Sequence, residues 1–384
     1  MKRSVKLLIL VMFGISLCSC QSIPASDVQA SASPESASDS SAPDSLNPQD
    51  DNSIYQFHKP LVENDGLLEI APLDLPSEIN GRKLAPSNIL SETQLLVLLY
   101  EEYTVPVVQE VGIYDLTSGE YSVSFAVEEG KSISIEWASD DLVVYKETDA
   151  SGNAVSLRYW KLDTGDNLLV YQFSQGYCDT SASRNQVVSD NGKIYFDDIV
   201  TREGKLVGVN LLEYDLETQQ VTIFKENAQN PMVLDSGLAY ITRDEATGTF
   251  CVESARTEEK IPLDQRISAL ASASDELYSI NNRSTDPETG RTIWSLDSLV
   301  AEEELLLSSN VIDGPAANRS VVTWRNFTPE RPILYLREED CFTVFLEDEI
   351  AYNTYLLGDD WGILICSHDD APTTYYRFSR AAEK

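Results

Sequence analysis

Histidine is scarce in this 384-residue sequence, which contains only two. His58 precedes the strand-rich region, and His368 stands in a Ser-His-Asp-Asp stretch. A catalytic triad needs three groups that converge in space, and neighbours along one loop cannot do so. The sequence also has no G-x-S-x-G motif for a nucleophile elbow. We therefore predict no triad, and we interpret His368 as part of a solvated loop.

Metal-binding patterns are missing as well. The sequence has no C-x-x-C, no closely spaced pair of histidines and no D-x-D-x-D-G calcium loop. Beyond residue 20, four cysteines remain, far apart along the chain: Cys178, Cys251, Cys341 and Cys366. A domain of this size does not need a disulfide framework. We predict free thiols, and neither a metal nor a cofactor.

Positive charge is the third shortage, because 28 Lys and Arg face 63 Asp and Glu, for a net charge of −35. A chain this acidic repels nucleic acid and anionic lipid head groups. We predict no nucleic-acid partner and attribute the charge to solubility. Glycosidases use paired carboxylates, but among 63 acidic residues such pairs occur by chance and do not indicate an enzyme. The S-x-D-x-G-x-x-x-W box of sialidases is absent.

Long hydrophobic runs are absent too, since the only candidate is Leu7–Leu17 behind Lys2, Arg3 and Lys6. A membrane-spanning helix needs about 20 apolar residues. The charged start and the short apolar core are typical of an export signal. The run ends in Leu17-Cys18-Ser19-Cys20.

This ending resembles the bacterial lipobox. In that family the thiol of the final cysteine, here Cys20, receives a diacylglyceryl group and becomes the first residue after cleavage. Cys18 is less usual at its position, and an ordinary secretory signal is the alternative. The resemblance implies an extracytoplasmic protein anchored by lipid to the cell membrane, with residues 1–20 as its signal peptide. Cleavage would remove three positive charges and lower the net charge from −35 to −38.

Residues 21–55 are predicted to be a disordered tether. From Gln21 to Asn52 there are nine Ser, six acidic residues and four Pro, but no Lys, Arg or aromatic residue. Such a stretch buries too little apolar surface to offset its ordering entropy. An interaction tail is the alternative interpretation. Residues 60–384 remain for one folded domain.

Two phrases recur through that domain. The first is a strand that ends in a turn, clearest in IYDLTSG from Ile113, YWKLDTG from Tyr159 and EYDLET from Glu213, with weaker copies centred on Ala255, Leu296, Leu336 and Phe378. The second is a polar turn before a strand, clearest in SDNGKIYF from Ser189. Its strands begin at residues 95, 142, 194, 238, 277, 321 and 363, a mean spacing of about 44 residues.

Both phrases give seven repeats, each with room for four short strands. In the second repeat these are residues 132–137, 142–147, 155–162 and 167–173. A four-stranded unit of this length has the size of a propeller blade. We predict an all-β fold, a β-propeller of seven four-stranded blades, with six or eight blades as alternatives because the weaker copies can be merged or split.

The two ends of the domain predict how the ring closes. The last repeat offers only three strands before the chain reaches Lys384, and the strand Gly66–Pro72 belongs to no repeat. We predict that this N-terminal strand completes the last blade, since an open ring would leave an unpaired sheet edge.

The turn phrases resemble those of bacterial TolB-like and related β-propeller domains, and the chain also resembles propeller lipoproteins of Gram-positive bacteria. The resemblance spans residues 60–384 and rests on blade turns, so it implies a fold and no particular site.

Ligand recognition is the function that remains. In propellers the connections between blades and the middle hairpin loops open on one face. We predict ligand-binding side chains there, Tyr177 and Arg184 in the long connection 174–186 and Trp324 at the start of another loop, because aromatics and Arg commonly anchor binding faces. Capping of blade ends is the simpler explanation of the same residues. The predicted function is binding of a protein or glycan, and the alternative is a glycan hydrolase or lyase that uses carboxylates around the channel.

Overall fold

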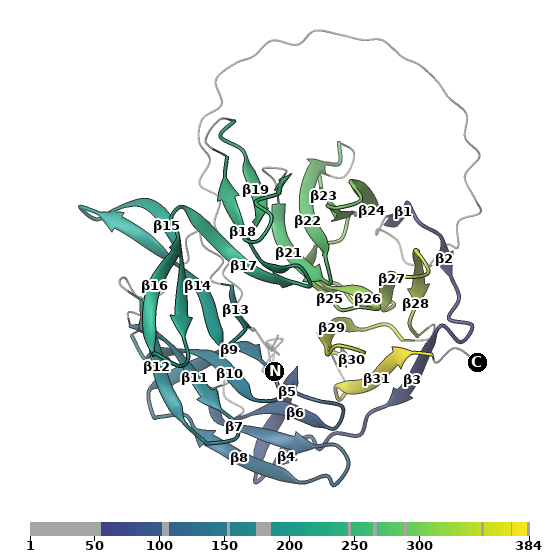
Figure 1. Cartoon of the computed structure of the whole chain (residues 1–384). Helices are drawn as coiled ribbons and strands as arrows, with labels where there is room; N and C mark the ends of the chain where they lie inside the picture. The colour runs from purple at the N-terminus through teal and green to yellow at the C-terminus, as the bar shows by residue number, and fades with distance from the viewer. Residues whose placement is uncertain are drawn as a thin grey trace, which may run out of the picture.

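Seven sheets make up the protein. The computed structural model describes residues 55–101, 107–151, 154–173, 186–244, 247–263, 267–287, 290–346, 349–369 and 371–381, and within them it contains strands and turns but no helix. The sheets follow one another in chain order around a common centre (Figure 1). Each innermost strand lies beside those of both neighbouring sheets, and that of the last sheet lies beside that of the first. The chain is therefore a closed β-propeller of seven blades.

Blades one to four occupy the first part of the ring. Blade one contains β4 (Glu78–Ile79), β5 (Arg82–Ile89), β6 (Gln94–Glu101), β7 (Val107–Asp115) and β8 (Tyr121–Ala126); blade two β9 (Lys131–Ala138), β10 (Leu142–Asp149), β11 (Val155–Lys161) and β12 (Asn167–Gln172); blade three β13 (Val187–Asp190), β14 (Lys193–Arg202), β15 (Lys205–Asp215) and β16 (Gln220–Lys225); blade four β17 (Ala228–Leu234), β18 (Gly237–Arg243), β19 (Phe250–Ser254) and β20 (Lys260–Pro262).

Blades five to seven each include a strand from the start of the domain. Blade five contains β21 (Ile267–Ala273), β22 (Glu276–Thr285), β23 (Thr292–Ser298), β24 (Glu303–Ser308) and β1 (Tyr55–Phe57); blade six β25 (Ile312–Ala317), β26 (Val321–Asn326), β27 (Ile333–Leu336), β28 (Cys341–Val344) and β2 (Leu61–Val62); blade seven β29 (Tyr352–Leu357), β30 (Trp361–Ser367), β31 (Thr374–Arg380) and β3 (Leu68–Pro72).

The recurring sequence phrases are the two turns at one end of each blade. The second phrase leads into the second strand, so that β10 begins at Leu142 and β26 at Val321. The first phrase joins the third and fourth strands. There the carboxylate of Asp115 accepts hydrogen bonds from the backbone N–H groups of Thr117 and Ser118, at 2.9 and 2.8 Å. These bonds lower the pKa of the Asp115 carboxyl, and they explain why Asp recurs in this turn.

Ring closure follows the prediction. β3 pairs antiparallel with β31, from Leu68 opposite Arg380 to Pro72 opposite Tyr376, and becomes the outer strand of blade seven. No sequence pattern indicated β1 and β2, which add fifth strands to blades five and six (Figure 1). The described part of the ring begins at Tyr55.

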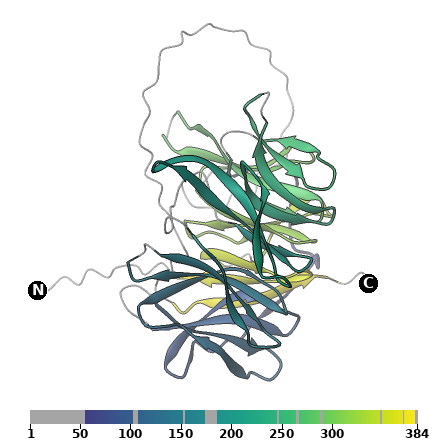
Figure 2. The same ribbon diagram turned by 60° about the vertical axis from the view of Figure 1, so that its left-hand side comes forward.

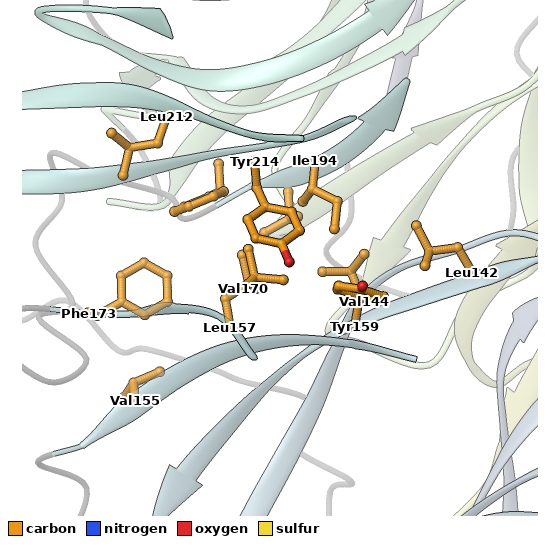
Figure 3. Close-up of a cluster of buried hydrophobic side chains, with 12 residues drawn as sticks. Leu142, Val144, Val155, Leu157, Tyr159, Val170, Phe173, Ile194, Leu212 and Tyr214 are labelled. Atoms are coloured by element: carbon orange, nitrogen blue, oxygen red, sulfur yellow. The ribbon is translucent and has the colours of Figure 1, made fainter. Parts of the chain in front are cut away.

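The core lies between the blades. The boundary between blades two and three is filled by side chains from both, with Leu157 and Tyr159 on one side and Ile194 and Tyr214 on the other (Figure 3). The rings of Tyr159 and Tyr214 lie 5.9 Å apart. Because a blade has a neighbour on each face, its middle strands are apolar on both sides; β10 opens with five consecutive buried residues.

Three of the four cysteines predicted to be free thiols lie in the described residues, and all three are free and buried. Cys251, Cys341 and Cys366 belong to blades four, six and seven. Burial raises the pKa of each thiol, that of Cys366 to about 12, so these groups stay protonated and unreactive. Cys178 lies outside the described residues.

Candidate functional site on the loop face

One face of the ring carries both the connections between blades and the middle hairpin loops. Strands alternate in direction within a blade, so the connection between its second and third strands opens at the same end as the connection to the next blade. We call this end the loop face. The views in Figures 1 and 2 show the ring from two directions, with strands of all seven blades crossing between its two faces.

A partly buried carboxyl group lies on this face between blades five and six. Glu330 belongs to the middle hairpin loop of blade six, and both of its carboxyl oxygens lie 2.6 Å from the hydroxyl of Tyr55. The side-chain amide of Asn310 donates to the same group at 3.1 Å. Backbone bonds with Ala351 and a bond from the Asn353 amide to the Glu330 carbonyl, 2.9 Å long, fix the loop itself.

Burial changes the acidity of this group. It raises the pKa of the Glu330 carboxyl to about 7, although the hydrogen bonds from Tyr55 and Asn310 act in the opposite direction. Burial and the nearby carboxylate also hold the pKa of Tyr55 well above its usual value. Glu330 can therefore gain or lose a proton near neutral pH.

His368 takes part in a second polar group, on blade seven. Its Nε2 atom lies 2.9 Å from Glu349, and the hydroxyl of Tyr376 lies 3.5 Å from the same carboxylate. The prediction of a solvated loop residue was wrong, because this side chain is only 23% exposed and lies against an acid from the preceding connection. His58 is likewise placed, 3.4 Å from Glu304.

Two acids of blade three, Asp197 and Asp198 on β14, make hydrogen bonds to neighbouring blades. Asp198 accepts a hydrogen bond from the Tyr171 hydroxyl at 2.9 Å, and Asp197, which is fully buried, accepts one from the backbone of Asn230 at 2.7 Å. The two acids follow the apolar strand residues Ile194–Phe196 as the polar residues of a turn would, so the sequence did not indicate that they would be buried.

The predicted binding residues have different outcomes. Tyr177 and Arg184 lie outside the described residues, so their role stays a prediction. Trp324 lies on β26 with 1% of its surface exposed, and its ring meets Phe342 edge-on at 6.1 Å. Its indole is therefore part of the core between blades five and six and is not offered at the surface, because both faces of that strand are covered.

Polar atoms remain without a protein partner near this core. Among the described residues, the indole nitrogens of Trp294 and Trp324 and the amide oxygen of Asn326 are buried and accept or donate no hydrogen bond. Trp294 and Asn326 lie near the loop-face ends of β23 and β26, as Tyr55 does on β1. The boundary between blades five and six thus contains unpaired polar atoms at this face.

Metal ligands do not gather in the described part of the chain, where no group of three His, Cys, Asp or Glu side chains is placed to hold an ion. The described residues likewise include no helix that is long and apolar enough to cross a bilayer.

Similarity to known proteins is confined to the fold. No protein-family model and no curated protein matches the sequence. Among solved structures, an oligogalacturonate lyase in complex with manganese is similar over 86% of this chain and 97% of its own, with a TM-score of 0.51 and 12% identity. The β-propeller domain of the Trilobed protease from Pyrococcus furiosus is similar over 79% and 96%, with a TM-score of 0.50 and 9% identity.

These two structures support the propeller assignment and nothing finer. The Pyrococcus domain is described as having an open velcro topology. The present ring differs, since β3 closes its last blade through five residue pairs with β31.

Proposed function

We propose that this protein is anchored outside the cytoplasm by a lipid on Cys20 and that the loop face of its propeller binds a protein or glycan ligand. The lipobox-like ending and the polar tether support the anchor. The closed ring supports the recognition role, since it holds seven sets of loops on one rigid frame.

One observation favours binding over catalysis: among the described residues, three partly or fully buried carboxyl groups at the loop face are already engaged by the fold. Glu330 is held by Tyr55 and Asn310, Glu349 by His368, and Asp198 by Tyr171. A general acid or base has to reach the substrate proton itself. Carboxyl groups that are bound to neighbouring side chains serve instead to fix loops in place.

A glycan hydrolase or lyase is the second candidate. Glu330 favours it, because an acid with a pKa near 7 suits proton transfer, and the fold is shared with an oligogalacturonate lyase. Catalysis would require the Glu330 carboxyl to transfer a proton, whereas ligand recognition would not. A substitution of Glu330 therefore separates the two candidates.

Ligand binding is tested with the protein from residue 21 onward. Peptidoglycan fragments, plant polysaccharide oligomers and peptides are screened for binding, with product analysis of every mixture. We expect binding without product, weakened about tenfold or more by Tyr177→Ala or Arg184→Ala, the scale of an interface anchor. Val300→Ser, at an exposed site on blade five, is the matched control. Product formation that Glu330→Gln abolishes would establish the enzyme instead.

Lipidation is tested separately. In a host with the lipoprotein pathway, the wild-type protein is expected in the membrane fraction, with a mature mass that includes the diacylglyceryl group. Cys20→Ala should lose the lipid mass, because the variant has no thiol at residue 20 to receive the diacylglyceryl group. If Cys20→Ala remains in the membrane with the mature mass of the wild type, Cys20 is not the lipid attachment site.

A further inference from the structure

The outer rims of the blades are not equivalent. Among the described residues, β1 and β2 cover the outer strands of blades five and six, while β3, β8, β12, β16 and β20 are fourth strands that end their sheets without a further neighbour. An uncovered edge strand presents free backbone donors and acceptors, and proteins usually protect it with charge, proline or short length.

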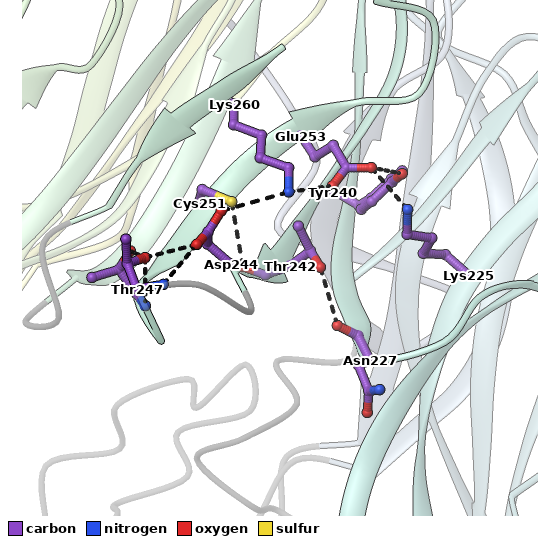
Figure 4. A network of polar contacts seen from close by, with 10 residues as sticks. Lys225, Asn227, Tyr240, Thr242, Asp244, Thr247, Cys251, Glu253 and Lys260 are labelled. Atoms are coloured by element: carbon purple, nitrogen blue, oxygen red, sulfur yellow. Dashed lines mark hydrogen bonds and ion pairs between the residues drawn. The ribbon is translucent and has the colours of Figure 1, made fainter. Parts of the chain in front are cut away.

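β16 lacks that protection. β20, by contrast, is three residues long and includes Lys260 and Pro262. β16 runs for six residues, QVTIFK, and its apolar residues Val221, Ile223 and Phe224 are 36%, 55% and 37% exposed. Its one charged residue, Lys225, is paired with Glu253 of blade four at 2.9 Å (Figure 4). Apolar exposure of this kind on a strand edge marks an interaction site or an aggregation hazard.

The apolar rim continues onto the neighbouring blade. Val221 lies opposite Tyr214 in the register of blade three, and Leu168, which is 37% exposed, lies opposite Tyr159 in blade two. Because the two tyrosine rings are 5.9 Å apart across the blade boundary, Leu168 and Val221 flank the same buried pair from outside. A strand beside β16 would meet apolar surface on both blades.

The protein itself shows how such an edge is covered. β1 pairs antiparallel with β24, the outer strand of blade five, and its Phe57 ring lies 4.9 Å from Phe342 of blade six. An extended segment of three residues thus completes one sheet and fills the outer boundary with an apolar side chain. The edge of β16 is longer than β1, and no described strand covers it.

The charge around the edge of β16 indicates which kind of partner could pair with it. Asp163, Glu217 and Glu226 are exposed at the two ends of the rim, and the whole chain carries a net charge of −35. A second copy would bring the same negative charge to the contact, whereas Lys or Arg would complement it.

We propose that the outer edge of β16 docks an extended segment of a partner protein as a fifth strand, with alternating apolar side chains and with Lys or Arg at its ends. Main-chain hydrogen bonds would provide affinity and the rim formed by Leu168, Val221 and Ile223 would provide selectivity, as in other cases of strand addition. This site lies on the circumference and is independent of the ligand proposed for the loop face.

The test uses the mature protein and the synthetic peptide KKVTITVTVKK, with KKVPIPVPVKK as a control whose prolines prevent strand pairing. We expect fluorescence anisotropy to show saturable binding of the first peptide only. Ile223→Asp should weaken that binding tenfold or more, whereas Val300→Asp, a charge placed at an equally exposed apolar site on a turn of blade five, should not. Unchanged melting temperatures establish that both variants are folded.

Three outcomes would overturn the proposal. The first is no binding of KKVTITVTVKK at about 1 mM, the upper limit of useful affinity. The second is binding that Ile223→Asp leaves intact. The third is a dimer of the wild-type protein in light scattering that Ile223→Asp dissociates, which would assign the edge to a second copy of this chain.

Discussion

Deletion of residues 60–75 from the mature protein is expected to abolish cooperative unfolding or to lower the melting temperature by about 10 °C or more. The deletion removes β3 and with it five residue pairs to β31. It also removes Leu68, which is buried against the core that includes Leu364 and Phe378. Loss of a buried leucine alone costs about 2–5 kcal/mol, and about 1 kcal/mol shifts the melting temperature of a domain this large by about 2 °C.

A matched truncation separates ring closure from mere shortening. Deletion of residues 21–50 removes a longer segment that ends before the first described strand, and it should leave the melting temperature unchanged. Leu68→Asp offers a point change in the same strand and should destabilise in the same direction. Equal melting temperatures for both truncations and the full mature protein would show that β3 does not hold the ring together.

The stability of the protein should depend on Glu330 in a pH-dependent way. The folded state raises the pKa of this carboxyl from 4.5 to about 7, so between these values the folded protein binds more protons at this site than the unfolded chain does. Stability from this group is then fully present below about pH 4.5 and is lost as pH rises through about 7. The shift corresponds to about 3 kcal/mol as an order of magnitude.

Glu330→Gln makes the effect measurable, because the amide keeps an acceptor for Tyr55 but cannot ionise. Between pH 5 and 8 the wild-type protein should lose unfolding free energy relative to Glu330→Gln, measured by denaturant titration at about five pH values. Two titratable groups meet Glu330, Tyr55 and Tyr355, and burial raises the pKa of both far above this range. Glu217→Gln, at an exposed turn, is the control. A constant difference between wild type and Glu330→Gln across this range would refute the assignment.

The propeller itself could be predicted because its repeats encode local structure. The Asp-x-x-Ser/Thr turn at Asp115 and Asp215 is stabilised by hydrogen bonds within four residues, so it leaves a readable pattern wherever it occurs. The strand Gly66–Pro72 could be assigned by counting, since blade seven lacked one strand and only one segment was unused.

The parts that escaped prediction depend on partners far away in sequence. β1 and β2 are three and two residues long, too short to show a period, and blade edges assembled from residues about 250 positions later decide that they become strands. Trp324 was expected at the surface because it precedes a loop, yet the neighbouring blade covers it.

Sequence alone determined the seven repeats, the turn chemistry, the closing strand and the acidic, histidine-poor character that argues against nucleic-acid binding and zinc. Only the tertiary structure decided which side chains are buried at the loop face. The raised pKa of Glu330 arises from its burial in the closed ring, beside Tyr55, which lies 275 positions away in the chain. The open rim at β16 arises because β1 and β2 add outer strands to blades five and six and to no other described blade. Hydrogen bonds within a turn depend on neighbouring residues and can be predicted from them. The burial of a side chain and the charge around it depend on which distant segments the closed ring brings together.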